Sequence, residues 1–280
     1  MPAARLALVL TATLNLSTLA HGDRHDHIDA ITEKLVAKPN QPALLLEHSD
    51  LHFQHEEYDQ ALRDLVLAER LDPKAAPFPL LRARAYIPAG FPRLGSEELG
   101  PFLASQPKHG PAWLLLAQAQ LATKQMKEAA LAYDQAVATL ERVEPQIILE
   151  QCRAWAASGK GGEATALLRL ESALKNLGGA IPALLDCHVD LLVLNGKLDA
   201  ACAELERQAA ELNRKDSVLL KKAELLASHN RLAEALTALL AAQANLATLP
   251  EHVRQRDDVV DSAKKIQERI ELLQRRVNIR

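Results

Sequence analysis

The sequence predicts an all-α protein built as an array of stacked helical hairpins, and three observations support this. Pro39, Pro73 and Pro107 lie 34 residues apart. Aromatic residues make up only 3% of the 280 residues and glycine only 11 positions, which favours helix over strand. A column of small residues, called here the ladder, recurs at nearly the proline period: Ala61, Gly95, Ala129, Ala164, Ala201 and Ala235. A fixed period of this length is typical of a repeat array rather than of one globular core.

The first 20 residues have the layout of a secretory signal peptide. Arg5 supplies a positive charge, residues 6–19 are mostly apolar, and small residues precede a cleavage point after Ala20. The apolar stretch is short for a membrane span and Asn15 interrupts it, so we expect no stable membrane span after cleavage. We therefore expect an exported protein, periplasmic or extracellular. The alternative is a first helix that happens to be apolar.

The repeats follow this leader in order. Residues 21–41 are expected to form a capping half-repeat, because Ile31 lies 34 residues before the apolar Leu65 and Pro39 ends its helix. Residues 42–249 are expected to form six hairpins, at about 42–75, 76–109, 110–143, 145–178, 182–215 and 216–249.

Two columns accompany the ladder and explain how each hairpin packs. A partner column of mostly small residues lies on the first helix of each repeat, where it allows close approach of the second: Ser49, Ala83, Ala117, Cys152, Val189 and Ala223. An apolar column lies four residues after each ladder position, on the same helical face: Leu65, Leu99, Tyr133, Leu168, Leu205 and Leu239. Both columns should be buried.

These columns resemble the tetratricopeptide repeat (TPR). The resemblance is clearest at residues 44–73, through Ala61, Ala68 and Pro73, and at residues 113–136, through Trp113, Ala129, Tyr133 and Ala136. It covers residues 42–249 and implies a right-handed α–α superhelix whose first helices line a concave groove. It also implies a non-catalytic scaffold that binds a protein or peptide and needs no cofactor.

Some repeats depart from the pattern. Pro88 should end or kink the first helix of the second repeat, leaving an irregular loop to Pro92. Glu171 and Gln208 stand where the family usually has a small residue, which suggests a register slip of one residue in the fourth and fifth repeats.

The tail at residues 250–280 breaks the repeat and carries a heptad-like apolar seam: Val259, Ala263, Ile266, Ile270, Leu273 and Val277. The seam either caps the array or joins two chains as a short coiled coil, which would make a homodimer or a self-associating envelope-assembly scaffold.

The candidate peptide-binding groove follows from the resemblance. One position after each partner-column residue the chain is always polar, and four residues before each of the first four polar positions it is apolar. The polar row comprises Asp50, Arg84, Gln118, Arg153, Asp190 and Glu224, and the apolar neighbours are Leu46, Leu80, Leu114 and Leu149. Such a strip suits an extended peptide or a helix. The alternative is ordinary solvated surface.

Some of the ten histidines have the spacing of metal ligands. Six of them lie early in the chain: His21, His25, His27, His48, His52 and His55. His48, His52 and His55 share one helical face, and His21 would carry the new α-amino group after cleavage. Neutral imidazoles so placed can bind zinc or copper, giving a histidine-based metal-binding protein as an alternative function. Equally, His48 and His52 can be buried and hydrogen-bonded within the hairpin.

Composition excludes several other classes. The net charge of −3 offers no field for nucleic acid. No catalytic motif is recognisable, so no enzyme is expected. The glycine-rich run at residues 158–162 lacks the spacing of a phosphate loop. Cys152, Cys187 and Cys202 are an odd number in an exported chain, and we expect buried thiols rather than a disulfide framework.

Overall fold

The computed structural model describes residues 27–177 and 181–278 of the 280-residue chain. Within those ranges the regular structure is helical, without strands, so the all-α prediction is confirmed. The chain divides after Gly159 into two compact units. The predicted signal peptide lies outside the described residues.

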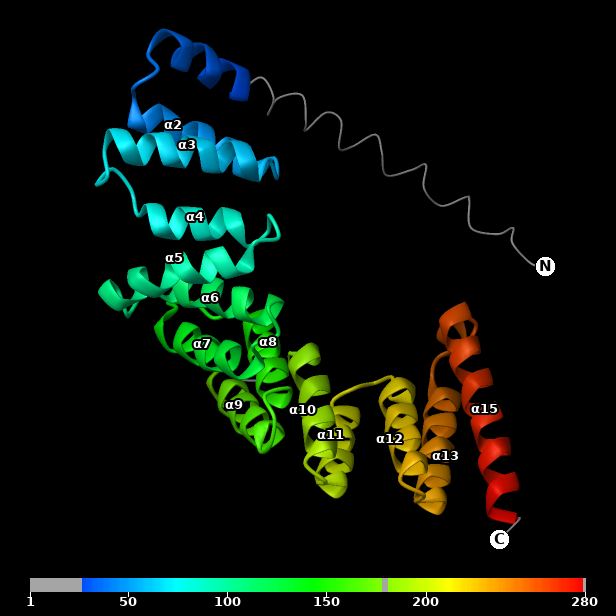
Figure 1. Ribbon diagram of the computed structural model, residues 1–280. Helices are drawn as coiled ribbons and strands as arrows, with labels where there is room; N and C mark the ends of the chain where they lie inside the picture. The colour runs from blue at the N-terminus through cyan, green and yellow to red at the C-terminus, as the bar shows by residue number, and fades with distance from the viewer. Residues whose placement is uncertain (1–26, 178–180, 279–280) are drawn as a thin grey trace, which may run out of the picture. The chain divides into compact units, whose positions relative to one another are not determined.

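Unit 1 contains a helix over residues 27–37 and seven further helices (Figure 1). Within the unit these seven pack consecutively, each against its neighbour in the sequence, as expected of stacked hairpins. Their bounds are α2 Pro42–Gln54, α3 Tyr58–Leu71, α4 Phe78–Tyr86, α5 Pro92–Ser105, α6 Gly110–Ala122, α7 Met126–Thr139 and α8 Pro145–Ala156.

Unit 2 continues in the same way and ends in one long helix (Figure 1). Helices α9 to α13 pack consecutively, and α15 packs on α13 and α12. The bounds are α9 Gly162–Leu177, α10 Pro182–Leu194, α11 Leu198–Ala210, α12 Asp216–Ser228, α13 Leu232–Thr248, α14 Glu251–Arg254 and α15 Asp257–Asn278. None of the helices in the described residues is long and apolar enough to cross a membrane.

Local sequence sets the ends of these helices. A proline occupies the first or second position of many first helices, where its fixed φ suits the helix and its missing N–H costs nothing. Inside the hairpins the turn passes through a left-handed residue. These residues form a column of their own, the turn column: Glu56, Gly90, Lys124, Gly196 and Asn230, with φ of 62°, 88°, 62°, 70° and 63°.

The core follows the predicted columns in five of the six repeats. The partner column is buried throughout, and so are the ladder residues other than Ala164 and the apolar column other than Leu168. Ala61, Ala129, Ala201 and Ala235 are each at most 1% exposed. Small side chains therefore do let the two helices of these hairpins approach closely.

The register of the fourth repeat differs from the prediction. Ala164 is exposed and Leu168 is 64% exposed, whereas the buried positions of α9 are Ala166, Leu170 and Ala173. The ladder has therefore slipped by two residues, not one. The cause is the turn at residues 157–161, which has five residues where residues 55–57, 123–125, 195–197 and 229–231 have three. In the fifth repeat Ala201 and Leu205 are buried as predicted, and Ala209 rather than Gln208 is the small buried residue.

The second repeat behaves as its prolines predict. Helix α4 ends at Tyr86, residues 87–90 form turns, and α5 starts at Pro92. This turn is also five residues long, but α4 is correspondingly short, so the register of Gly95 is kept. A Cβ atom on Gly95 would lie 2.7 Å from Cγ1 of Ile87, which explains why glycine replaces alanine there.

The apolar seam of the tail packs within its own chain. Val259, Ile266, Ile270 and Leu273 are buried in a cluster with Leu239 and other residues of α12 and α13. Ala263 is exposed, because the buried face passes instead through Ser262, whose hydroxyl donates to Asp216. The seam thus covers the end of the array. The three cysteines are thiols, with Cys152 and Cys202 buried and Cys187 half-buried.

Candidate functional site

The first part of the predicted polar row lies on successive first helices of unit 1. Asp50, Gln118 and Arg153 are exposed on α2, α6 and α8, and Arg84 is half-buried on α4. Nη1 of Arg84 donates to Oδ1 of Asp50 at 3.1 Å. Two residues one repeat apart are thus in direct contact, which is what a row along neighbouring first helices requires.

A small pocket lies beneath this ion pair. It has a volume of about 140 Å³ and is lined mainly by apolar side chains of α2, α3 and α4, including Leu46, Leu65 and Leu81, with Asp50 and Arg84 also lining it. Phe53 forms a further part of the lining, and Cζ of Arg84 lies 3.9 Å from the centroid of its ring. A guanidinium held over an aromatic face in this way gains a cation–π interaction.

The predicted apolar neighbours do not all face this pocket. Leu46 lines it. Leu80 and Leu114 are half-buried and pack into the hairpin cores of the second and third repeats, and Leu149 is buried. These three leucines therefore contribute mainly to the interior of the repeats.

Unit 2 carries the other two members of the row, Asp190 and Glu224, both exposed. Nζ of Lys221 lies 2.8 Å from Asp186 and 3.9 Å from Asp190. Glu224 lies 3.6 Å from Lys265 and from Arg269 of α15. A pocket of about 310 Å³ is lined by Glu224 and by residues of α15 such as Leu272 and Arg276. The terminal helix therefore borders the row here.

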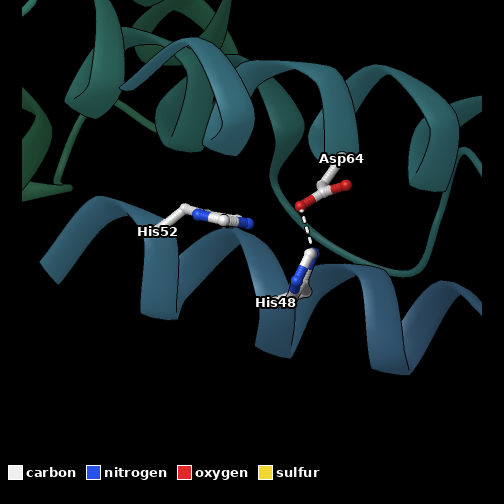
Figure 2. A group of neighbouring side chains, drawn as sticks. All are labelled: His48, His52 and Asp64. Atoms are coloured by element: carbon white, nitrogen blue, oxygen red, sulfur yellow. Dashed lines mark hydrogen bonds and ion pairs between the residues drawn. The ribbon is translucent and has the colours of Figure 1, made fainter. Parts of the chain in front are cut away.

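A second cluster lies on the α2–α3 hairpin and joins His48, His52 and Asp64 (Figure 2). Nδ1 of His48 lies 2.8 Å from Oδ2 of Asp64, and the two imidazole rings meet edge to face at 4.3 Å. Nδ1 of His52 lies 2.5 Å from Oε2 of Glu57. Burial raises the pKa of Asp64 above its ordinary value, although the neighbouring His48 opposes this shift. One potential ligand atom from each of the three residues lies within 4.8 Å of the others.

Of the predicted metal candidates, this cluster contains His48 and His52 but not His55, and His21 lies outside the described residues. The third member, Asp64, comes from the neighbouring helix.

Neither a family model nor a curated protein sequence matches the chain. Solved structures do match it in fold. A tetratricopeptide repeat protein from Parabacteroides merdae is 14% identical, with 92% of this chain and 95% of that chain covered and a TM-score of 0.52. A chain in the structure of Naa15/Naa10 bound to HypK-THB is 17% identical, with 81% of this chain but only 36% of that chain covered and a TM-score of 0.55. The fold is that of the tetratricopeptide-repeat proteins.

The sequence predicted some residues of both sites in the TPR repeats, the pocket beside Arg84 and the histidine cluster, but not all of them. The polar row was found from its period, and Asp50 and Arg84 do meet. Phe53 was missed, although it lies three residues after Asp50 and so one helical turn further along α2. Asp64 was missed because it lies on the second TPR helix, where only pairing between helices brings it to His48. Asp64 follows His48 by 16 residues, a separation that places the two residues on the two paired helices of one hairpin. That separation could have indicated the contact.

Proposed function

We propose that the chain is a non-catalytic TPR scaffold that binds a protein partner through a peptide segment lying along the first helices. The observation that carries this proposal is the contact of Arg84 with Asp50 and Phe53 above an apolar pocket. The pocket can take one apolar side chain of the peptide, while the flanking polar groups bind its backbone and fix its register.

The charges of unit 1 favour a peptide that carries a carboxylate. Arg153 is exposed on the row, and Arg84 and Asp50 have side chains 42% and 50% exposed. An ion pair so exposed contributes only about 0–1 kcal/mol, so a partner carboxylate can replace Asp50 at little cost. Arg84 can then bind that carboxylate with its charge-assisted donors.

We place this scaffold in the cell envelope, periplasmic or extracellular, because of the leader-like residues 1–20. Mass spectrometry of the protein purified from its native host tests this: a chain starting at His21, found outside the cytoplasm, is expected. A chain that keeps residues 1–20 and stays in the cytoplasm would exclude export.

Site-specific photo-crosslinking tests the binding surface. A benzophenone amino acid is placed at Gln118, on the polar row, or at Leu131, which is 49% exposed on the second helix of the same repeat. We expect a discrete cross-linked partner from Gln118 only, and its loss when Arg84→Glu and Arg153→Glu are combined.

Two results would contradict the groove proposal. One is equal cross-linking from Gln118 and Leu131. The other is a partner that remains cross-linked in a double charge-reversal variant with a wild-type circular dichroism spectrum.

A further inference from the structure

We propose that His48, His52 and Asp64 bind a divalent transition-metal ion, specifically Zn²⁺, on the α2–α3 hairpin. None of these three residues lines the pocket beside Arg84, so this site is separate from the peptide surface. Two imidazoles and a carboxylate are a ligand set that zinc accepts, with a fourth position left to water.

The hydrogen bond of His52 directs its second nitrogen to the cluster. Glu57 holds Nδ1 of His52 at 2.5 Å, and a carboxylate accepts, so Nδ1 carries the proton. The lone pair of a neutral His52 then lies on Nε2, which points toward His48 and Asp64 in Figure 2. Histidines that bind metals usually donate their other N–H to a carboxylate in this manner, because the contact fixes both tautomer and ring orientation.

The contacts of His48 with Thr32 and Asp64 likewise determine which of its nitrogens can bind the metal. The hydroxyl of Thr32 donates to the carbonyl oxygen of Ile28 at 2.8 Å. Since that hydroxyl has only one proton, its oxygen accepts the contact from Nε2 of His48 at 3.0 Å, and Nε2–H is the donor. Nδ1 of His48 therefore faces Asp64, with one proton between the nitrogen and Oδ2. A metal ion bound to both atoms would take the place of this proton.

The spacing of the three groups suits a tetrahedral ion. Bonds of about 2.0–2.1 Å to zinc put neighbouring ligand atoms roughly 3.3 Å apart. The present separations include 2.8 Å between His48 and Asp64 and none above 4.8 Å. Rotations of the side chains, without a shift of the helices, can therefore bring the three atoms to zinc distances. Because the ligands come from both α2 and α3, the ion would clamp the first hairpin.

Isothermal titration of the tag-free chain with ZnCl₂ tests the site. We expect one site that weakens at least tenfold in Asp64→Asn and in His52→Gln, and by about 10–100-fold in Glu57→Gln, which removes only the positioning contact. The matched control is His55→Gln, one turn beyond His52 on the same histidine-bearing face, which should bind as the wild type does. Circular dichroism verifies that each variant is folded.

Absence of zinc binding at micromolar concentrations would overturn the proposal. Binding that survives both Asp64→Asn and His52→Gln would also overturn it, since the zinc would then sit elsewhere, for example on His21, His25 and His27. A spectrum of the wild-type chain with Co²⁺ needs no variant: intense visible bands of a four-coordinate ion are expected, and weak octahedral bands alone would contradict the site.

Discussion

Ser49 and Ala61 meet across the first hairpin, where the Ser49 hydroxyl donates to the backbone carbonyl oxygen of Ala61 at 3.0 Å. Ser49 is 5% exposed and Ala61 is 1% exposed. The side chain of one helix reaches the backbone of the other only because both positions carry small residues. This contact explains the 34-residue period. The ladder and its partner column recur because the two helices of each hairpin must approach closely at one point.

The corrected register of the fourth repeat gives the first prediction. Ala166→Leu should reduce the free energy of unfolding by about 1–3 kcal/mol, because a larger side chain overpacks a fully buried position. Ala164→Leu, two residues away on the same helix, should change it by no more than about 0.5 kcal/mol, because Ala164 is exposed. Urea unfolding followed by circular dichroism measures both. If Ala164→Leu were the more destabilising variant, Ala164 would be the buried position, as the uniform ladder predicts.

Much of the fold was predictable because it depends on a period that repeats. Close packing restricts Ala129, Ala201 and Ala235 to small side chains. Small residues therefore recur at a regular spacing that is visible in the sequence. The slip at Ala166 was harder to predict, since it depends on the length of one turn. Glu171 in place of a small residue was its signal, and that residue is exposed as the two-residue slip requires.

The candidate sites were predictable only where their residues share one helix or one repeat position. Asp50 and Arg84 occupy the same position of successive repeats, so period alone pairs them. Asp64 and Glu57 meet the histidines through side-chain geometry that no spacing specifies. Leu80 shows the converse: its spacing matched the strip, but its side chain packs inside its own repeat.

A buried tyrosine gives a prediction at alkaline pH. Tyr133 is 0% exposed, and its hydroxyl donates to Oε2 of Glu150 at 2.8 Å. Burial and this hydrogen bond raise its pKa well above the ordinary value of 10.0. The unfolded chain therefore loses the proton first, so the contribution of Tyr133 to stability is fully present below pH 10 and is lost as the pH rises above it.

Comparison with Tyr133→Phe isolates this effect, because other tyrosines titrate equally in both proteins. At about pH 8 the variant should be less stable by about 0.5–1.5 kcal/mol, the value of one hydrogen bond. The difference should shrink by about 1.4 kcal/mol between about pH 8 and about pH 11, because one pH unit beyond the ordinary pKa is worth about that much. Urea unfolding across this range measures it. A difference that stays constant with pH would show that Tyr133 ionises normally.

Asp216 gives a prediction at acidic pH. It is 1% exposed at the start of α12; Arg214 donates to both of its oxygens, at 2.8 and 3.0 Å, and Ser262 of α15 also donates to it. Burial alone would raise its pKa, but these hydrogen bonds outweigh burial and lower the pKa below the ordinary 3.8. The carboxylate therefore stabilises the fold above pH 3.8, and this stabilisation is lost as the pH falls below that value.

Asp216→Asn should cost about 1–3 kcal/mol at neutral pH, because an amide N–H₂ then faces hydrogen-bond donors. Amide hydrogen exchange should become faster in α15, which Ser262 no longer ties to α12. Asp257→Asn is the matched control, since Asp257 is exposed in the first turn of α15. Equal exchange rates in the two variants would mean that Asp216 does not hold the terminal helix.

The terminal seam supports a prediction that separates capping from dimerisation. Ile266 is 0% exposed in the core of unit 2, whereas Leu272 is 47% exposed on the same helix. If the seam caps the array, Ile266→Ala should cost about 2–5 kcal/mol of stability and expose α13 to hydrogen exchange. Leu272→Ala should change stability by about 0.5 kcal/mol or less. A coiled-coil dimer predicts another result: sedimentation would show Ile266→Ala and deletion of residues 250–280 converting dimers to stable monomers.

The turn column gives the last prediction, in which the same substitution, lysine to glycine, should change stability in opposite directions at two positions. Lys124 has a φ of 62°, in the left-handed region where its Cβ is strained, and Gly90 and Gly196 occupy the equivalent positions of other repeats. Lys124→Gly should therefore stabilise the protein by about 1 kcal/mol. Lys127 lies in the first turn of α7 and is exposed, so Lys127→Gly should destabilise by up to about 1 kcal/mol. Thermal and urea unfolding measure both variants. Destabilisation by Lys124→Gly would contradict the strained turn, because the charge and side chain lost are the same in the two substitutions and only the backbone conformation differs.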